Sequence, residues 1–236
     1  KKNNLEVAEK LYRKILDTNP EHFESTLLLG TLSAQIKNFD EAKQLLQKAI
    51  KINPNYAEAH YNIGLVFGEL LDTEQAIKSF NYAIKLNPSY VDAHNNLGNC
   101  YKQIEDFNKA VNCYEKAIEI NPNYANAYSN LGVVFRKLGE DQKAINSYEK
   151  AIQLQPDHIE AYYNFGLALE DLGKEMQAIE CYKKIIKINP NYSDAYNNLG
   201  NCNKELGNFD KAISYYEKAI EYRPENLAYF YPLVQL

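Results

Sequence analysis

The stretch AYNNLGNC at residues 195–202 decides how the rest of the chain is read. Asparagine and glycine are weak helix formers, each costing about 0.5–1 kcal/mol relative to alanine, so their presence inside a helix needs a separate reason. Versions of the stretch recur every 34 residues: HYNIGLVF from His60, HNNLGNCY from His94, YSNLGVVF from Tyr128 and YYNFGLAL from Tyr162. A constant period in this range indicates a repeat architecture.

The prolines keep the same period along nearly the whole chain. They stand at Pro20, Pro54, Pro88, Pro122, Pro156, Pro190 and Pro224. Of the 236 residues 45% are apolar, which is ample for a core strung along the repeats, so we expect one elongated domain.

Charge and hydropathy exclude several function classes. The net charge is −5, with acidic and basic residues interspersed, which speaks against nucleic-acid or anionic-membrane partners. There is no apolar run of membrane-spanning length, and the amino end, KKNNLEVAEK, lacks the apolar centre of a signal peptide. We therefore expect a cytoplasmic protein. Since the chain begins without methionine and partway through a repeat, we also expect it to be a fragment.

One period, residues 193–226, predicts a helical hairpin. Apolar positions recur at helical spacing on both sides of a break, LGNFD. In this break Gly207 can take the left-handed conformation that ends a helix, and Asn208 or Asp210 can cap the next one. The second helix should end near Arg223, because proline disfavours helical geometry in the residue before it.

Two rows of small residues run through the repeats, glycines in the first helices and alanines in the second. They are Gly30, Gly64, Gly98, Gly132, Gly166 and Gly200, and Ala42, Ala76, Ala110, Ala144, Ala178 and Ala212. We expect the two rows to face each other, so that close packing offsets the glycine penalty. The large residues between them are predicted to be core.

With LG, the following aromatic and alanine positions, and a proline closing each period of 34, the chain resembles the tetratricopeptide repeat family. The resemblance implies an all-α fold, an α-solenoid of stacked helical hairpins that forms a right-handed superhelix. Residues 1–22 would be the second helix of a truncated repeat with its turn. Six full repeats would follow, at 23–56, 57–90, 91–124, 125–158, 159–192 and 193–226. Residues 227–236 would form a partial first helix or a capping tail, with 227–231 covering the last repeat before Pro232 breaks the helix.

The first helices also carry a polar face, which the resemblance places in the concave groove of the superhelix. Its centre is a row of asparagines at one position of successive repeats: Asn62, Asn96, Asn130, Asn164 and Asn198. Each amide offers two donor hydrogens and an acceptor, which suits the main chain of a peptide. The five levels should hold roughly 12 extended residues.

The row is similar to one in the repeat domain of O-linked N-acetylglucosamine transferases, which holds an extended peptide. Beside it the predicted groove contains Tyr61, Asn95, Asn99, Tyr163, Asn197 and Asn201, with acidic residues Glu58, Asp92, Glu160 and Asp194 at its edge. An alternative is that the asparagines bond to neighbouring helices. Many groove residues recur after three repeats, which suggests two subsites, around Tyr61 with Asn95 and around Tyr163 with Asn197. Simple duplication explains this equally well.

Other kinds of site find no support in the sequence. The cysteines Cys100, Cys113, Cys181 and Cys202 lack CxxC spacing and are expected to be reduced core residues. The histidines lie in the stacking row or the turns between repeats, so we expect no metal and no cofactor. The lysines and arginine of a carboxylate clamp are also missing.

The sequence thus predicts a non-enzymatic scaffold that binds an extended protein or peptide segment through the asparagine row. The alternative is a substrate-recruiting arm of a larger modifying enzyme, such as a glycosyltransferase resembling O-linked N-acetylglucosamine transferase. A third hypothesis is self-association through exposed repeat ends.

Overall fold

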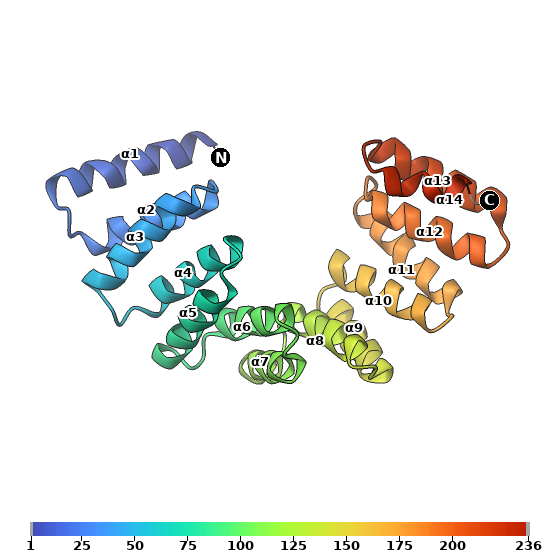
Figure 1. Cartoon of the computed structure of the whole chain (residues 1–236), viewed down its shortest axis with the longest axis horizontal. Helices are drawn as coiled ribbons and strands as arrows, with labels where there is room; N and C mark the ends of the chain where they lie inside the picture. Colours follow the sequence, from blue (N-terminus) through green and yellow to red (C-terminus); the bar gives the residue numbers. More distant parts are fainter. Residues whose placement is uncertain (1, 235–236) are drawn as a thin grey trace. The chain divides into compact units, whose positions relative to one another are not determined.

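The computed structural model describes residues 2–234, and their regular structure is entirely helical (Figure 1). By contact density the chain divides into two compact units, Lys1–Pro122 and Asn123–Leu236, here called the first and second unit. The sequence predicted a single elongated domain. A division of this kind is typical of repeat architectures, in which each repeat contacts mainly its sequence neighbours.

The first unit consists of a single helix followed by three hairpins. Its helices are α1 Lys2–Thr18, α2 Phe23–Gln35, α3 Phe39–Ile52, α4 Ala57–Glu69, α5 Thr73–Leu86, α6 Val91–Gln103 and α7 Phe107–Ile120. Within the unit consecutive helices pack on each other, from α1 on α2 to α6 on α7.

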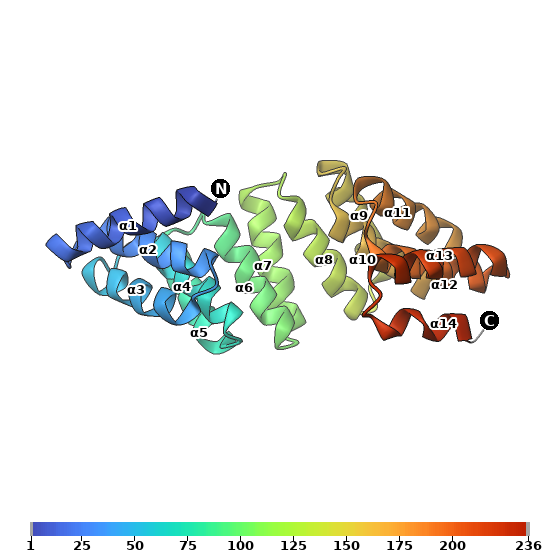
Figure 2. The same ribbon diagram turned by 90° about the horizontal axis from the view of Figure 1, so that it is seen from above.

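The second unit has the same plan, with three hairpins followed by a short tail (Figure 2). Its helices are α8 Ala125–Lys137, α9 Asp141–Leu154, α10 Ile159–Asp171, α11 Glu175–Ile188, α12 Ser193–Glu205 and α13 Phe209–Tyr222, then η1 Leu227–Tyr229 and α14 Tyr231–Val234. Consecutive helices again pack on each other. Both units are therefore all-α repeat solenoids, as predicted.

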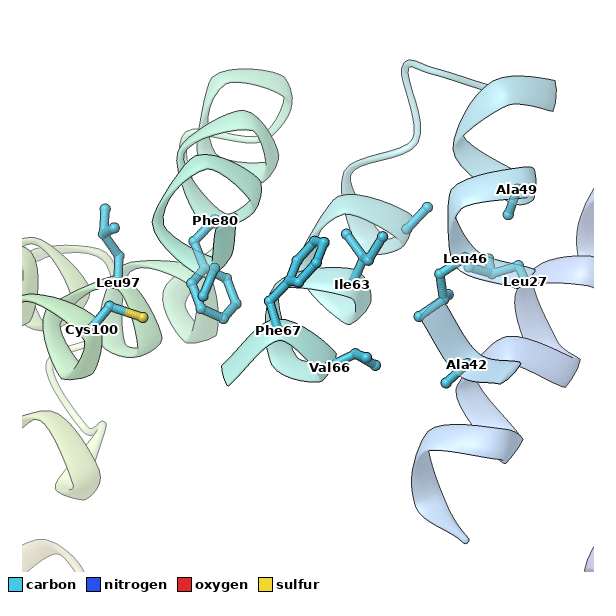
Figure 3. Packing of buried hydrophobic residues seen from close by; sticks show 12 residues of the cluster. Leu27, Ala42, Leu46, Ala49, Ile63, Val66, Phe67, Phe80, Leu97 and Cys100 are labelled. Carbon is cyan, nitrogen blue, oxygen red and sulfur yellow. The ribbon is translucent and has the colours of Figure 1, made fainter. Parts of the chain in front are cut away.

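The core of each unit is built from the large residues of the second helices. Leu46, Phe80, Tyr114, Tyr148, Tyr182 and Tyr216 are at most 2% exposed. Figure 3 shows how Leu46 and Phe80 lie among side chains of neighbouring helices, including Ile63 and Phe67.

The expected pairing of the glycine and alanine rows is wrong in one respect. A Cβ built at Gly98 would lie 2.6 Å from Tyr114 Cε1, and one at Gly200 would lie 2.4 Å from Tyr216 Cε1. The nearest neighbours of the glycines are thus the large core residues and not the alanines. Glycine is required because the ring occupies the space of a side chain.

The turn within each hairpin uses a left-handed residue, as predicted at Gly207, where φ is +73°. The second unit has glycine at all three such positions, whereas the first unit has Lys37, Leu71 and Glu105, with φ of 63°, 59° and 60°. At the other end of the hairpin α13 ends at Tyr222, directly before Arg223, as expected.

The carboxyl-terminal tail differs from the predicted five-residue cover. Within residues 227–231 only Tyr229 is buried, and its hydroxyl donates to Asp194 Oδ1 at 2.6 Å, whereas Leu227 and Tyr231 are 79% and 72% exposed. Pro232 does not prevent a helix, because it lies in the first turn of α14, where its missing N–H is tolerated. Residues 235–236 of the predicted tail lie outside the described part.

Candidate peptide-binding surface

In the first unit the asparagine row comprises Asn62 on α4 and Asn96 on α6, both half-buried. Asn62 Nδ2 donates to Thr31 Oγ1 of α2 at 3.1 Å, and Asn96 Nδ2 donates to Tyr61 Oη of α4 at 3.0 Å. Each asparagine therefore bonds to the first helix of the preceding repeat. This is the neighbouring-helix role that the sequence left open as an alternative.

The Asn96 amide is also part of a longer chain of hydrogen bonds. Tyr114 Oη donates to Asn99 Oδ1 at 2.8 Å, and Asn99 Nδ2 donates to Asn96 Oδ1 at 3.3 Å. Together with the bond from Asn96 to Tyr61, the chain links the core of one repeat to the polar face of the repeat before it. The orientation of the Asn96 side chain is therefore fixed.

Fixing an amide in this way does not exhaust its bonding capacity. A primary amide carries two N–H hydrogens and two oxygen lone pairs, and the two bonds of Asn96 described above use one of each. The Asn62 bond to Thr31 uses one hydrogen. The remaining hydrogens and lone pairs are held in place by these bonds, an arrangement that reduces the entropy an amide loses when it binds a ligand.

Tyr61 and Asn95, also predicted for the groove, differ in accessibility. Tyr61 is half-buried, with its ring centroid 4.7 Å from that of Tyr90. Burial, with the charge of Asp92, raises the pKa of Tyr61 to about 12, so the phenol stays neutral. Asn95 is only 5% exposed and is not presented as the sequence predicted.

Two hollows lie along the polar face of the first unit. The larger, here the Thr31 hollow, has a volume of about 410 Å³ and lies between α2 and α4; its lining includes Thr31, Phe39, Asn62 and Lys37. The smaller, the Gly68 hollow, has about 190 Å³ and is lined by Gly64, Leu65, Gly68, Glu69, Phe80, Asn96, Asn99, Cys100 and Gln103. Leu65 and Glu69 contribute to both hollows.

The second unit repeats the tyrosine arrangement of the first. Tyr163 lies with its ring centroid 6.0 Å from that of Tyr192, and Tyr216 Oη donates to Asn201 Oδ1 at 2.9 Å. Burial raises the pKa of Tyr163, and the nearby Asn198 amide offsets part of this effect. The recurrence after three repeats is thus present in the local geometry of both units.

The asparagine row of the second unit is less uniform than expected. Asn130 and Asn164 are half-buried, but Asn198 is only 7% exposed. Asn198 Oδ1 accepts from Asn197 Nδ2 at 3.4 Å, and its buried Nδ2 faces tyrosine hydroxyls without forming a hydrogen bond of regular geometry. Asn198 therefore belongs to the interior of its repeat as much as to a binding face.

The acidic edge is exposed at Glu58 and Asp92 in the first unit and at Glu160 in the second. Asp194 differs, since it accepts from Tyr229 Oη and lies 3.8 Å from Arg223 Nη1. Its carboxylate already has partners within the fold, so it is a poorer candidate for ligand contact than the other three.

A buried polar pair in the second unit was not predicted. Tyr182 Oη donates to Glu170, and burial raises the pKa of this carboxyl above its usual range. Sequence reasoning also missed the hollows. Gly68 could have indicated them from the sequence, because this glycine falls outside the recurring glycine row.

The cysteines and histidines have structural surroundings. Cys100, Cys181 and Cys202 are buried and Cys113 is half-buried, all as free thiols. His60 and His94 bond through Nε2 to the carbonyl oxygens of Pro54 and Pro88 at 2.9 and 3.0 Å. Among residues 2–234 no group of three or more His, Cys, Asp and Glu side chains is placed to hold a metal ion.

The fold and the surface together define a helical-repeat protein. Comparison with models of protein families identifies the family of repeats. Models described as tetratricopeptide repeat match residues 91–124, 159–192 and 193–226, and also 113–146; a model described as TPR repeat matches 30–70, 72–104 and 132–173. The chain belongs to the tetratricopeptide repeat family. None of the described helices is long and apolar enough to cross a membrane.

Solved structures agree with this assignment. The chain is 30% identical to MamA protein, with 73% of this chain and 94% of that one covered and a TM-score of 0.61. It is 25% identical to YrrB, described as a TPR protein with an unusual peptide-binding site, with 79% and 96% covered and a TM-score of 0.60. The fold is also that of pilF from Pseudomonas aeruginosa, at 20% identity, 91% and 97% coverage and a TM-score of 0.77. A comparison with curated proteins gave no match.

Proposed function

We propose that this chain is a non-catalytic scaffold that binds an extended peptide segment along the polar face of its first helices. The observation that carries the proposal is the pair of fixed amides, Asn62 and Asn96, at equivalent levels of successive repeats. Such amides can donate to and accept from a peptide main chain without first being ordered. Family membership and the likeness to a peptide-binding relative support the same function.

The surface chemistry favours a peptide in extended form. First helices of successive repeats are spaced at a packing distance of about 8–10 Å, which about three extended residues span. Recognition of the peptide main chain at each level tolerates many different side chains of the peptide. Specificity for a particular peptide sequence must then come from the hollows beside the amides.

The proposal is tested by replacing both amides. Because a neutral hydrogen bond contributes about 0.5–1.5 kcal/mol, Asn62→Ala with Asn96→Ala should weaken binding of extended peptides about tenfold. Fluorescence anisotropy with a peptide of about 12 residues would measure this, at a temperature where circular dichroism shows both proteins folded.

Asn81→Ala is the matched control. Asn81 lies on α5, is exposed, and donates to the Ile77 carbonyl oxygen of its own helix. Binding should be unaffected by this change. If the double variant loses stability but keeps the parent's peptide affinity, the asparagine row is structural and the proposal is wrong.

A further inference from the structure

Gly68 is the least explained glycine of the first unit. It lies in the last turn of α4, where glycine is a poorer helix former than alanine. A Cβ built there meets no atom within 4 Å, so packing does not require glycine, and the left-handed residue of this turn is Leu71. The other repeats have side chains at this position: Ala34, Lys102, Arg136, Glu170 and Lys204.

Because Gly68 has no side chain, space remains open between α4 and α6, and this space is the Gly68 hollow. Its volume of about 190 Å³ is several times the roughly 30 Å³ of one water molecule. Gly64 and Phe80 contribute apolar surface, which suits the methylene stem of a long side chain. A side chain at position 68 would occupy part of this space.

The polar groups of the hollow are rich in acceptors. Glu69 contributes an exposed carboxylate that forms no ion pair among the side chains that the structure describes. Asn96, Asn99 and Gln103 contribute amide oxygens, and those of Asn96 and Asn99 each keep a second lone pair beside the bond they accept within the fold. None of the residues lining this hollow is cationic. A planar guanidinium has five donors and no acceptor, and it matches carboxylate geometry better than an ammonium does.

The geometry points to the Gly68 hollow as a pocket for an arginine side chain of the bound segment, a proposal that rests on the proposed function. The neighbouring Thr31 hollow, on the other side of Leu65, takes an apolar side chain of the same segment, because Ala34, Phe39 and Val66 line it. About three extended residues separate the two side chains. The preferred partner is thus a basic and apolar segment, consistent with the chain's net charge of −5.

The test uses the full chain and blocked peptides of about 12 residues, with one leucine and one arginine three positions apart in a serine–alanine background. A second peptide has glutamine in place of arginine. Because hydrogen bonds to charged groups are stronger than those between neutral groups, the arginine peptide should bind about tenfold more tightly or better. Anisotropy titrations at fixed ionic strength measure the ratio.

Gly68→Ala is the decisive variant, because its effects on stability and binding should have opposite signs. Better helix propensity should raise Tm by about 2–4 °C, while the added methyl group should weaken the arginine peptide about tenfold. Glu69→Gln should abolish most of the preference for arginine. Glu115→Gln, an equal change of charge at an exposed site on α7, should leave the preference intact.

The possible outcomes separate this inference from the proposed function. If both peptides bind equally well, or if Gly68→Ala leaves the preference for arginine unchanged, the arginine pocket is wrong while peptide binding stands. If neither peptide binds at all, the proposed function fails and the pocket fails with it.

Discussion

Single residues at the hairpin turns distinguish the two units. The left-handed backbone conformation costs a residue that has a Cβ about 1–2 kcal/mol of conformational energy. Only glycine adopts it freely. The second unit has glycine at each such turn, whereas Lys37, Leu71 and Glu105 occupy the equivalent places in the first. The first unit therefore carries backbone strain that the second does not.

Leu71→Gly should accordingly stabilise the protein. Leu71 is 77% exposed, so little packing is lost, and relief of strain should exceed the greater entropy of glycine in the unfolded chain. We expect a net gain of about 0.5–1 kcal/mol in the free energy of unfolding, measured by urea denaturation.

Leu71→Ala separates the backbone effect from loss of the side chain. Alanine removes the leucine side chain but keeps the Cβ and hence the strain. The alanine variant should therefore show no gain in the free energy of unfolding. Equal stability of the glycine and alanine variants would show that the left-handed conformation is not a source of strain here.

At the scale of the helix, the amino-terminal cap of α10 depends on the protonation state of His158. Ala161 N donates to His158 Nδ1 at 3.3 Å, and His158 Nε2 lies 2.9 Å from Asn126 Oδ1 of α8. The neutral ring with its proton on Nε2 satisfies both contacts. Burial lowers the pKa of His158, although Glu160 and Asp157 act in the opposite direction.

This cap predicts a pH-dependent stability of the second unit. Because the pKa is lower in the folded state, the contribution of the neutral ring is fully present above the unfolded value of about 6.5. It is lost as the pH falls through that value toward the folded pKa. Amide exchange at Ala161, followed by NMR from about pH 7 to about pH 5, should report loss of protection.

His158→Asn supplies the comparison. Asparagine is a good capping residue that does not titrate, so protection at Ala161 should change less with pH in this variant. Identical pH profiles for the parent and the variant would exclude a role for His158 protonation.

The helices and turns were predictable from sequence, whereas the detail of the surface was not. Spacing alone indicated the hairpins and the break at Gly207, because helical periodicity and turn chemistry are local properties. The burial of Asn95 and Asn198 depends on packing between elements, as does the contact of Gly98 with Tyr114 in place of an alanine. The hollows arise from gaps between successive helices, which a repeat pattern does not reveal.

At the scale of the whole molecule, repetition explains both the fold and the proposed function. Each hairpin buries its apolar face against its neighbours, and stacking brings the same polar position to the half-exposed face of successive repeats, although Asn198 in the last repeat is buried. Within the first unit this places fixed amides beside two hollows. Recognition of an extended segment then needs no feature beyond regular stacking and local exceptions such as Gly68.

The most direct measurement of peptide binding is an NMR titration of the isotope-labelled full chain with the arginine–leucine peptide, read at the asparagine side-chain amides. The single Asn→Ala variants assign the resonances. We predict that the Nδ2 signals of Asn62 and Asn96 shift in a saturable manner while that of Asn81 on α5 stays in place. Saturable shifts confined to the second helices, with Asn62 and Asn96 unmoved, would contradict binding along the polar face.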